Sequence, residues 1–179
     1  YRREIIEKVP FLEGVIYEDV YTGINFLKNI RKMVVVDLTG YYYRFSPNST
    51  MTTSFNEKNL DIFNVGNQLI ASFQDDAYLL PYIGYFMFYL GVSHYYSDGI
   101  TKKSPCVSLY ENFIKESAFI AKQSQEVVRK YRLLRMYFIA PKYFLTITHP
   151  VYQFLYKGWS KFRKLTHKRQ MKELMNKND

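Results

Sequence analysis

The residues of this chain best suited to catalysis or metal binding are three histidines, one cysteine and two adjacent aspartates: His94, His149, His167, Cys106, Asp75 and Asp76. No His-Glu-x-x-His sequence and no carboxylate–histidine pair at metal-binding spacing occurs among them. A single cysteine excludes both an intrachain disulfide and a multi-cysteine metal site. Gly66 and Gly91 stand alone, so no glycine-rich phosphate-binding loop is present. The sequence therefore predicts no catalytic residue, no metal and no cofactor.

Each of these residues also has a simpler interpretation. Asp75 and Asp76 would point apart on a helix, so they are better suited to capping the N-terminus of the apolar segment that follows. Cys106 and His94 are conceivable as a nucleophile and its base, but a lone cysteine and a histidine often occur together by chance. His94 would also fit an axial ligand or a quinone contact, although a hydrogen-bonded histidine at an interface is the commoner case.

Residues 77–96 form a segment of twenty residues without a formal charge. As a helix it would be about 30 Å long, which matches the hydrocarbon core of a bilayer, so it is a possible transmembrane helix. Phenol hydroxyls that face lipid would lack hydrogen-bond partners. We therefore predict that the tyrosine face of this helix binds another protein; the alternative is a buried core helix. The tyrosine face consists of Tyr78, Tyr82, Tyr85 and Tyr89.

The positive charge of the chain lies in its last third. Residues 1–128 hold 12 Lys and Arg against 14 Asp and Glu, whereas residues 129–179 hold 13 against 2. Such a segment attracts anionic lipid, RNA or an acidic protein. Residues 151–175 are predicted to form a basic amphipathic helix that lies on a membrane surface or tracks RNA phosphates and stacks bases. Its membrane- or RNA-facing residues are Lys157, Trp159, Lys161, Phe162, Arg163, Lys164, Lys168 and Arg169.

The elements around these segments are predicted to be mainly α-helical. Apolar residues recur at helical spacing in residues 17–33 and 56–73, and residues 106–140 are predicted to be one long amphipathic helix. Residues 33–45 resemble a small β-hairpin. Residues 136–156, divided by two prolines, suit an interfacial position better than a second membrane crossing. We divide the chain into an N-terminal helical and hairpin region (1–74), a core or membrane helix with the long amphipathic helix (75–140) and a basic amphipathic C-terminal extension (141–179).

Together these features favour a non-catalytic accessory subunit of a large membrane-associated complex. The expected location is the mitochondrial inner membrane, in a respiratory-chain or ATP-synthase assembly, and the expected partners are other protein subunits and anionic lipid. The chain begins with Tyr1 rather than Met, as it would after removal of a presequence, although a truncated end fits equally. The alternative is an organellar ribosomal protein whose basic C-terminal third binds rRNA. A soluble enzyme without a recognisable motif is the third hypothesis.

Overall fold

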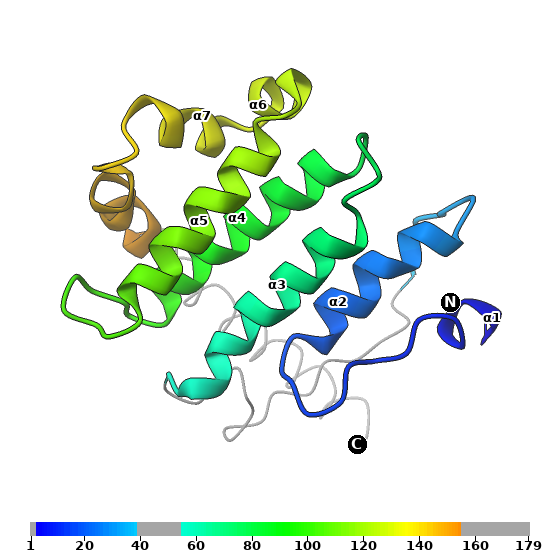
Figure 1. The fold of residues 1–179 in the computed structure, drawn as a ribbon. Helices are drawn as coiled ribbons and strands as arrows, with labels where there is room; N and C mark the ends of the chain where they lie inside the picture. The colour runs from blue at the N-terminus through cyan, green and yellow to red at the C-terminus, as the bar shows by residue number, and fades with distance from the viewer. Residues whose placement is uncertain (1–2, 39–54, 155–179) are drawn as a thin grey trace, which may run out of the picture. The chain divides into compact units, whose positions relative to one another are not determined.

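The computed structural model of the chain describes residues 3–38 and 55–154 (Figure 1). Helices dominate these ranges and no strand occurs in them, so the predicted mainly α fold is confirmed. A last helix, over residues 144–154, runs to the end of the described part. The other elements are α1 (Arg3–Ile6), α2 (Glu18–Asn25), η1 (Phe26–Asn29), η2 (Glu57–Leu60), α3 (Asp61–Ser72), α4 (Leu80–Ser97), α5 (Val107–Ala121), α6 (Gln125–Lys130) and α7 (Arg132–Ile139).

The contacts between residues divide the chain into two compact units, Tyr1–Lys130 and Tyr131–Asp179. We call them the N-terminal unit and the C-terminal unit. The boundary falls at Tyr131, whose extended backbone (φ −108°, ψ 105°) separates α6 from α7. The described part of the C-terminal unit therefore consists of α7 and the helix over residues 144–154.

The core of the N-terminal unit is formed by α3, α4 and α5. In the chain order of these helices, α2 packs on α3, α3 on α4 and α4 on α5, and Figure 1 shows the four side by side. The most extensive of these contacts is that between α4 and α5. The side chains at the centre of the core are Val65, Leu69, Phe73, Ile83, Met87 and Phe113.

The charge-free segment at residues 77–96 forms α4 and the turn before it. Within the described residues, no helix has the combination of length and hydropathy that a bilayer crossing requires. The prediction of a transmembrane helix is therefore wrong, because tyrosines, Ser93 and His94 lower the hydropathy of α4. Nine of the 18 residues of α4 are buried, with Met87 and Phe88 fully so. The lack of charge is compatible with this burial, since a charged side chain on the buried side of α4 would need a partner in the core.

Two glycines let α4 and α5 approach closely. A Cβ atom at Gly84 would lie 2.8 Å from the backbone nitrogen of Ala121 and 2.7 Å from Ile120 Cγ2. A Cβ atom at Gly91, two turns further along α4, would lie 3.0 Å from Ile114 Cγ1. Real Cβ contacts are almost never shorter than 3.0 Å, so Gly84 has no space for a side chain, and at Gly91 a side chain would fit only if its neighbours moved by a few tenths of an ångström. The facing side of α5 is also small, with Ala118 fully buried.

The predicted long helix over residues 106–140 is in fact three helices, α5, α6 and α7. α5 ends at Ala121, and the hydroxyl of Ser124 then accepts a hydrogen bond from the backbone N–H of Val127 at 3.4 Å. A serine that bonds the backbone in this way starts a new helix rather than continuing the old one. The predicted amphipathic pattern persists in part, since Val127 of α6 and Leu134 of α7 are fully buried.

The predicted β-hairpin does not form in the part of it that the structure describes. Residues 33–38 contain no strand, and residues 39–45 lie outside the described residues. Val34, Val35 and Val36 are exposed, Val35 to 88%. β-Branched residues favour strands mainly where they pack on a half-buried pleated surface, and these three side chains have no such surface.

Candidate functional site

The densest group of titratable side chains joins four segments of the N-terminal unit. The Tyr17 hydroxyl, at the start of α2, lies 3.4 Å from Nδ1 of His94 on α4. The same nitrogen is 3.8 Å from Oδ2 of Asp98, the residue that follows α4. Tyr110 of α5 donates a 2.6 Å hydrogen bond to this Oδ2, and Asn59 of η2 donates one of 3.5 Å to Oδ1. We call these five residues the polar cluster.

Burial controls the titration of the two tyrosines in the polar cluster. Loss of hydration raises the pKa of Tyr17 to about 12, and the charge of Asp98 contributes to the rise. Burial also raises the pKa of Tyr110 well above its ordinary value, and its hydrogen bond to Asp98 acts in the same direction. A raised pKa makes each phenol harder to ionise than a free tyrosine, and Tyr110 accordingly donates its proton in the hydrogen bond to Asp98.

The carboxylate of Asp98 is hydrogen-bonded by several members of the polar cluster and by its neighbour. Both carboxylate oxygens of Asp98 accept bonds from the protein, and Ser97 adds a third donor at 3.4 Å. Tyr17 holds a left-handed backbone (φ 71°), which a bulky residue rarely adopts, and its ring stands edge-on to His94 at 5.0 Å. This arrangement ties four segments together. Sequence reasoning identified His94 alone, because the other members lie far apart in the chain and follow no local spacing.

Asp76 and Cys106 were also considered for chemistry and are held within the fold, whereas His167 lies outside the described residues. Asp76 Oδ1 accepts hydrogen bonds from the backbone N–H groups of Tyr78 (3.1 Å) and Leu79 (2.8 Å), so the predicted capping role is confirmed for this residue. Cys106 is a buried free thiol at the start of α5. No group of three or more His, Cys, Asp or Glu that could hold a metal ion is found within residues 3–38 and 55–154.

The tyrosine face of α4 has two different environments. Tyr78 and Tyr89 are exposed, to 70% and 49%. Tyr82, in contrast, is half-buried and donates a 2.7 Å hydrogen bond to Glu126 of α6, and the Lys130 ammonium lies 5.6 Å from its ring centroid. The protein's own α6 therefore covers part of the predicted partner-binding face. Binding of another protein to the remaining exposed part stays a prediction.

The C-terminal unit exposes a row of large apolar side chains on one helix face. Its members recur every three or four residues through the helix over residues 144–154 and the turn before it, and they are between 55% and 78% exposed. Ile139, at the end of α7, is exposed to 82%. Single exposed apolar residues are ordinary, but a continuous row of them marks an interaction surface. The members of this apolar row are Tyr143, Ile147, Val151 and Phe154.

The other side of the same helix packs on α7. Phe144 and Thr148 are buried, and the ring of Phe144 stands edge-on to Tyr137 of α7 with 5.4 Å between centroids. Sequence reasoning missed this helix because it treated Pro150 as a helix break. The helix in fact continues through Pro150, and the spacing of Ile147 and Val151 across the proline was the signal that could have revealed it.

The formal charges in the described part of the C-terminal unit are all positive. The stretch 131–154 contains no Asp or Glu, and its three cationic residues, Arg132, Arg135 and Lys142, are exposed. The sequence that follows, residues 155–179, adds eight Lys and Arg against two acidic residues. That stretch lies outside the described residues, so the predicted contacts of Lys157 to Arg169 with lipid or RNA stay a prediction.

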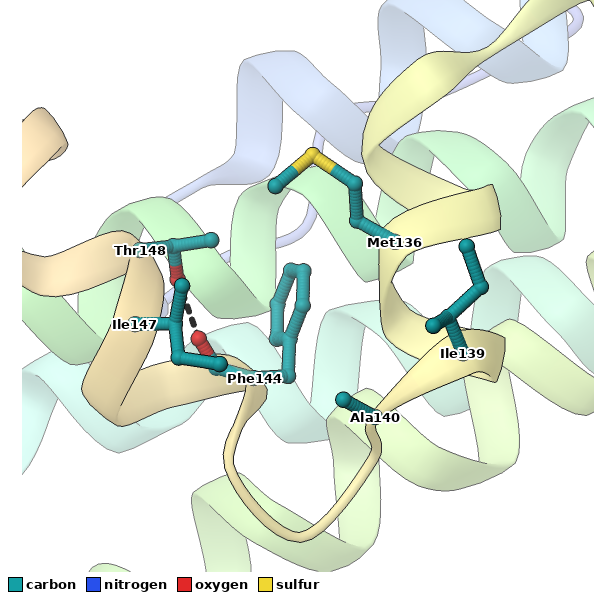
Figure 2. A pocket seen from close by; sticks show the side chains of 6 residues that line it. All are labelled: Met136, Ile139, Ala140, Phe144, Ile147 and Thr148. Carbon is teal, nitrogen blue, oxygen red and sulfur yellow. Dashed lines mark hydrogen bonds between the residues drawn. The ribbon is translucent and has the colours of Figure 1, made fainter.

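A small cavity lies between α7 and the helix over residues 144–154 (Figure 2). Its volume is about 150 Å³. The hydroxyl of Thr148 donates to the backbone carbonyl of Phe144 at 2.7 Å, so the one polar side chain in the lining is already engaged. The lining residues are Met136, Ile139, Ala140, Phe144, Ile147 and Thr148.

No family model, curated protein or solved structure matches this chain. The functional argument therefore rests on the chemistry of its surfaces.

Proposed function

We propose that this chain is a non-catalytic accessory subunit that attaches to an anionic membrane surface through its C-terminal unit. The observation that carries the proposal is the apolar row, in a unit whose described part has exposed charges of a single sign. An interfacial helix needs both features, because its apolar face enters the boundary between headgroups and acyl chains while its cations meet the lipid phosphates. The attachment is peripheral, and the mitochondrial inner membrane is the proposed location.

The apolar row and the cationic residues contribute comparable free energies to membrane binding. Full burial of a Val, Ile or Phe side chain is worth about 1.5–3 kcal/mol, and an interfacial position realises part of that for each member of the row. A Lys or Arg near an anionic surface adds about 1 kcal/mol. Arg132, Arg135 and Lys142 therefore add about 3 kcal/mol to the apolar contribution. Neither feature alone gives firm attachment.

The make-up of the apolar row favours lipid over RNA. Bases stack on aromatic rings, and Tyr143 and Phe154 could serve in that way. Ile139, Ile147 and Val151 have no π face, yet they are as exposed as the aromatic residues around them. Aliphatic side chains gain free energy from hydrocarbon rather than from nucleotides, so a bilayer uses the whole surface and RNA uses only part of it.

Neighbouring subunits are the proposed partners of the N-terminal unit. Tyr78 and Tyr89 remain exposed on the tyrosine face, beside Phe86, which is also exposed. Tyrosine combines a large apolar ring with one polar atom and is enriched in protein interfaces. The exposed tyrosines are therefore the proposed binding surface for another subunit, and the C-terminal unit is the proposed binding surface for the membrane.

Co-sedimentation with vesicles tests the membrane proposal. The full chain is mixed with phosphatidylcholine vesicles, and with vesicles in which part of that lipid is replaced by phosphatidylserine. We expect firm binding only to the anionic vesicles. The double variant Val151→Asn/Phe154→Asn keeps the charge of the chain and removes half of the apolar row, so its affinity should fall at least about tenfold. The matched control is Leu109→Asn, which removes an exposed apolar side chain of α5 and should bind like the parent.

Two results would contradict the proposal. One is equal binding of the parent and the double variant to anionic vesicles, which would reduce the interaction to charge alone. The other is a lack of vesicle binding together with binding to RNA that weakens steeply with salt, which would favour the ribosomal alternative. Circular dichroism of each variant establishes that a loss of binding is not a loss of folding.

A further inference from the structure

We propose that residues 31–38 pair with the same segment of a second copy of the chain, as two antiparallel strands related by a two-fold axis. We call these residues the valine segment. The inference concerns the N-terminal unit and does not depend on the attachment of the C-terminal unit to a membrane. It goes beyond the proposed function by naming a partner for a surface that the membrane proposal leaves unused.

The valine segment is exposed along its whole length. All of its residues are exposed, and its apolar side chains are between 65% and 88% exposed. A contiguous apolar run of this kind marks an interaction surface. Within residues 3–38 and 55–154, no hydrogen bond or ion pair involves this segment, so its backbone N–H and C=O groups are available to a partner. The apolar members are Met33, Val34, Val35, Val36 and Leu38.

The composition of the valine segment favours a strand once a partner is present. Its three successive valines are β-branched, and such side chains stabilise a strand when a neighbouring strand packs beside them. A partner strand also provides hydrogen bonds for the backbone, which a helical surface does not. The described part of the chain contains no strand, so it offers the valine segment no sheet edge. A second copy offers one, because the segment is complementary to itself.

The complementarity lies in the charges at the two ends of the valine segment. Arg31 stands at its start and Asp37 near its end. In the antiparallel register centred on Val34, Arg31 lies directly opposite Asp37 of the second copy, and the two-fold axis repeats this ion pair at the other end. A parallel pair would instead place Arg31 beside Arg31 and Asp37 beside Asp37. The charges therefore select the antiparallel pair.

The same register pairs the apolar side chains. Val34 lies opposite Val34 on one face of the ribbon, and Met33 lies opposite Val35 on the other face, twice by symmetry. Directly opposed side chains have Cβ atoms about 4.5–5.5 Å apart, so each of these pairs is in contact. A ribbon of two strands is only marginally stable, so we expect a dimer that dissociates on dilution.

Sedimentation equilibrium of the full chain over a range of concentrations tests the inference. We expect the parent to form dimers. Arg31→Asp places two carboxylates opposite each other at both ends of the ribbon, so it should weaken the dimer at least about tenfold, and Asp37→Arg should do the same. The combined variant Arg31→Asp/Asp37→Arg restores both ion pairs and should dimerise like the parent. The matched control is Lys32→Asp, which changes the net charge as Arg31→Asp does but lies opposite Val36, so it should weaken the dimer less.

Disulfide formation under mild oxidation tests the register. Val34→Cys places two thiols directly opposite each other and should give a covalent dimer. In Val36→Cys the two thiols are four residues apart along the strands, about 13 Å, so this variant should remain without a cross-link. Cys106 is buried and is the same in both variants.

Three results would overturn the inference. One is a parent that remains monomeric at every concentration, which would leave the valine segment for the sheet edge of another protein. Another is a combined charge variant that stays as weak as the single variants, and the third is equal cross-linking of Val34→Cys and Val36→Cys. Circular dichroism of each variant establishes that the helices remain folded, as expected for substitutions in an exposed segment.

Discussion

α4 and the helix over residues 144–154 have similar compositions and opposite environments. Both are rich in apolar and aromatic residues, and neither contains Lys, Arg, Asp or Glu. α4 nevertheless buries nine of its residues, whereas the second helix exposes the apolar row. The absence of charge therefore does not distinguish a core helix from a surface helix.

The neighbours of the two helices explain the difference. α4 has α3, α5 and α6 packed against it, and Gly84 and Gly91 allow α5 to come close. The helix over residues 144–154 has no glycine, and within the described part of its unit its partner is α7. Glycines that let a neighbouring helix come close thus accompany the buried helix pair, and the helix over residues 144–154, which lacks them, leaves one apolar face exposed.

Truncation of one phenylalanine in each helix measures the difference directly. Phe88 on α4 is fully buried, so Phe88→Ala should lower the free energy of unfolding by about 3–5 kcal/mol. Phe154 is 78% exposed, so Phe154→Ala should change it by no more than about 0.5 kcal/mol. Urea denaturation followed by circular dichroism gives both values. A similar loss in the two variants would show that the C-terminal helix face is covered within the free protein.

A single added methyl group tests the close contact between α4 and α5. Gly84→Ala places a Cβ within 2.8 Å of the backbone of α5, and overpacking of this kind costs about 1–3 kcal/mol. The matched control is Gly23→Ala in α2, where no atom lies within 4 Å of the added Cβ. That variant should gain up to about 1 kcal/mol from helix propensity. Thermal denaturation compares the two, and a gain in both would show that α5 moves aside without cost.

Sequence periodicity predicted helices better than it predicted their surroundings. The helical spacing in residues 56–73 corresponds to η2 and α3, and the charge-free segment corresponds to α4. Local backbone chemistry was also readable, as the capping by Asp76 shows. The membrane span was wrong because it was predicted from length and the absence of charge, whereas the tyrosines, Ser93 and His94 of α4 lower its hydropathy below what a crossing requires.

Other features depend on contacts that no local pattern contains. The break between α5 and α6 rests on one serine hydroxyl, which competes with a continuing helix by a small free energy. The polar cluster joins Tyr17 to Tyr110 through segments distant in the chain. The cavity arises only when α7 packs on the helix that follows it. Such sites require the packing of helices, whereas the basic charge of the C-terminal third was evident from composition.

A substitution in the polar cluster is expected to have the smallest effect on the free energy of unfolding. The cluster also contrasts the N-terminal unit with the C-terminal unit. The apolar row exposes hydrocarbon, whereas the N-terminal unit buries hydrogen-bonded polar groups as well. The folded-state pKa of Tyr17 is raised from its ordinary value of 10.0 to about 12, so the folded protein retains this proton at pH values where the unfolded chain loses it. The stability that results is fully present below pH 10 and declines as the pH rises from about 10 to about 12.

Tyr17→Phe removes the titrating hydroxyl and keeps the ring that stands against His94. The free energy of unfolding of this variant should therefore decline less between pH 10 and 12 than that of the parent. Some decline remains, because the pKa of Tyr110 is raised as well. Urea denaturation at a series of pH values gives the two curves. Parallel curves would mean that Tyr17 is hydrated in the folded protein and that the cluster is open to water, which would make His94 accessible to a ligand.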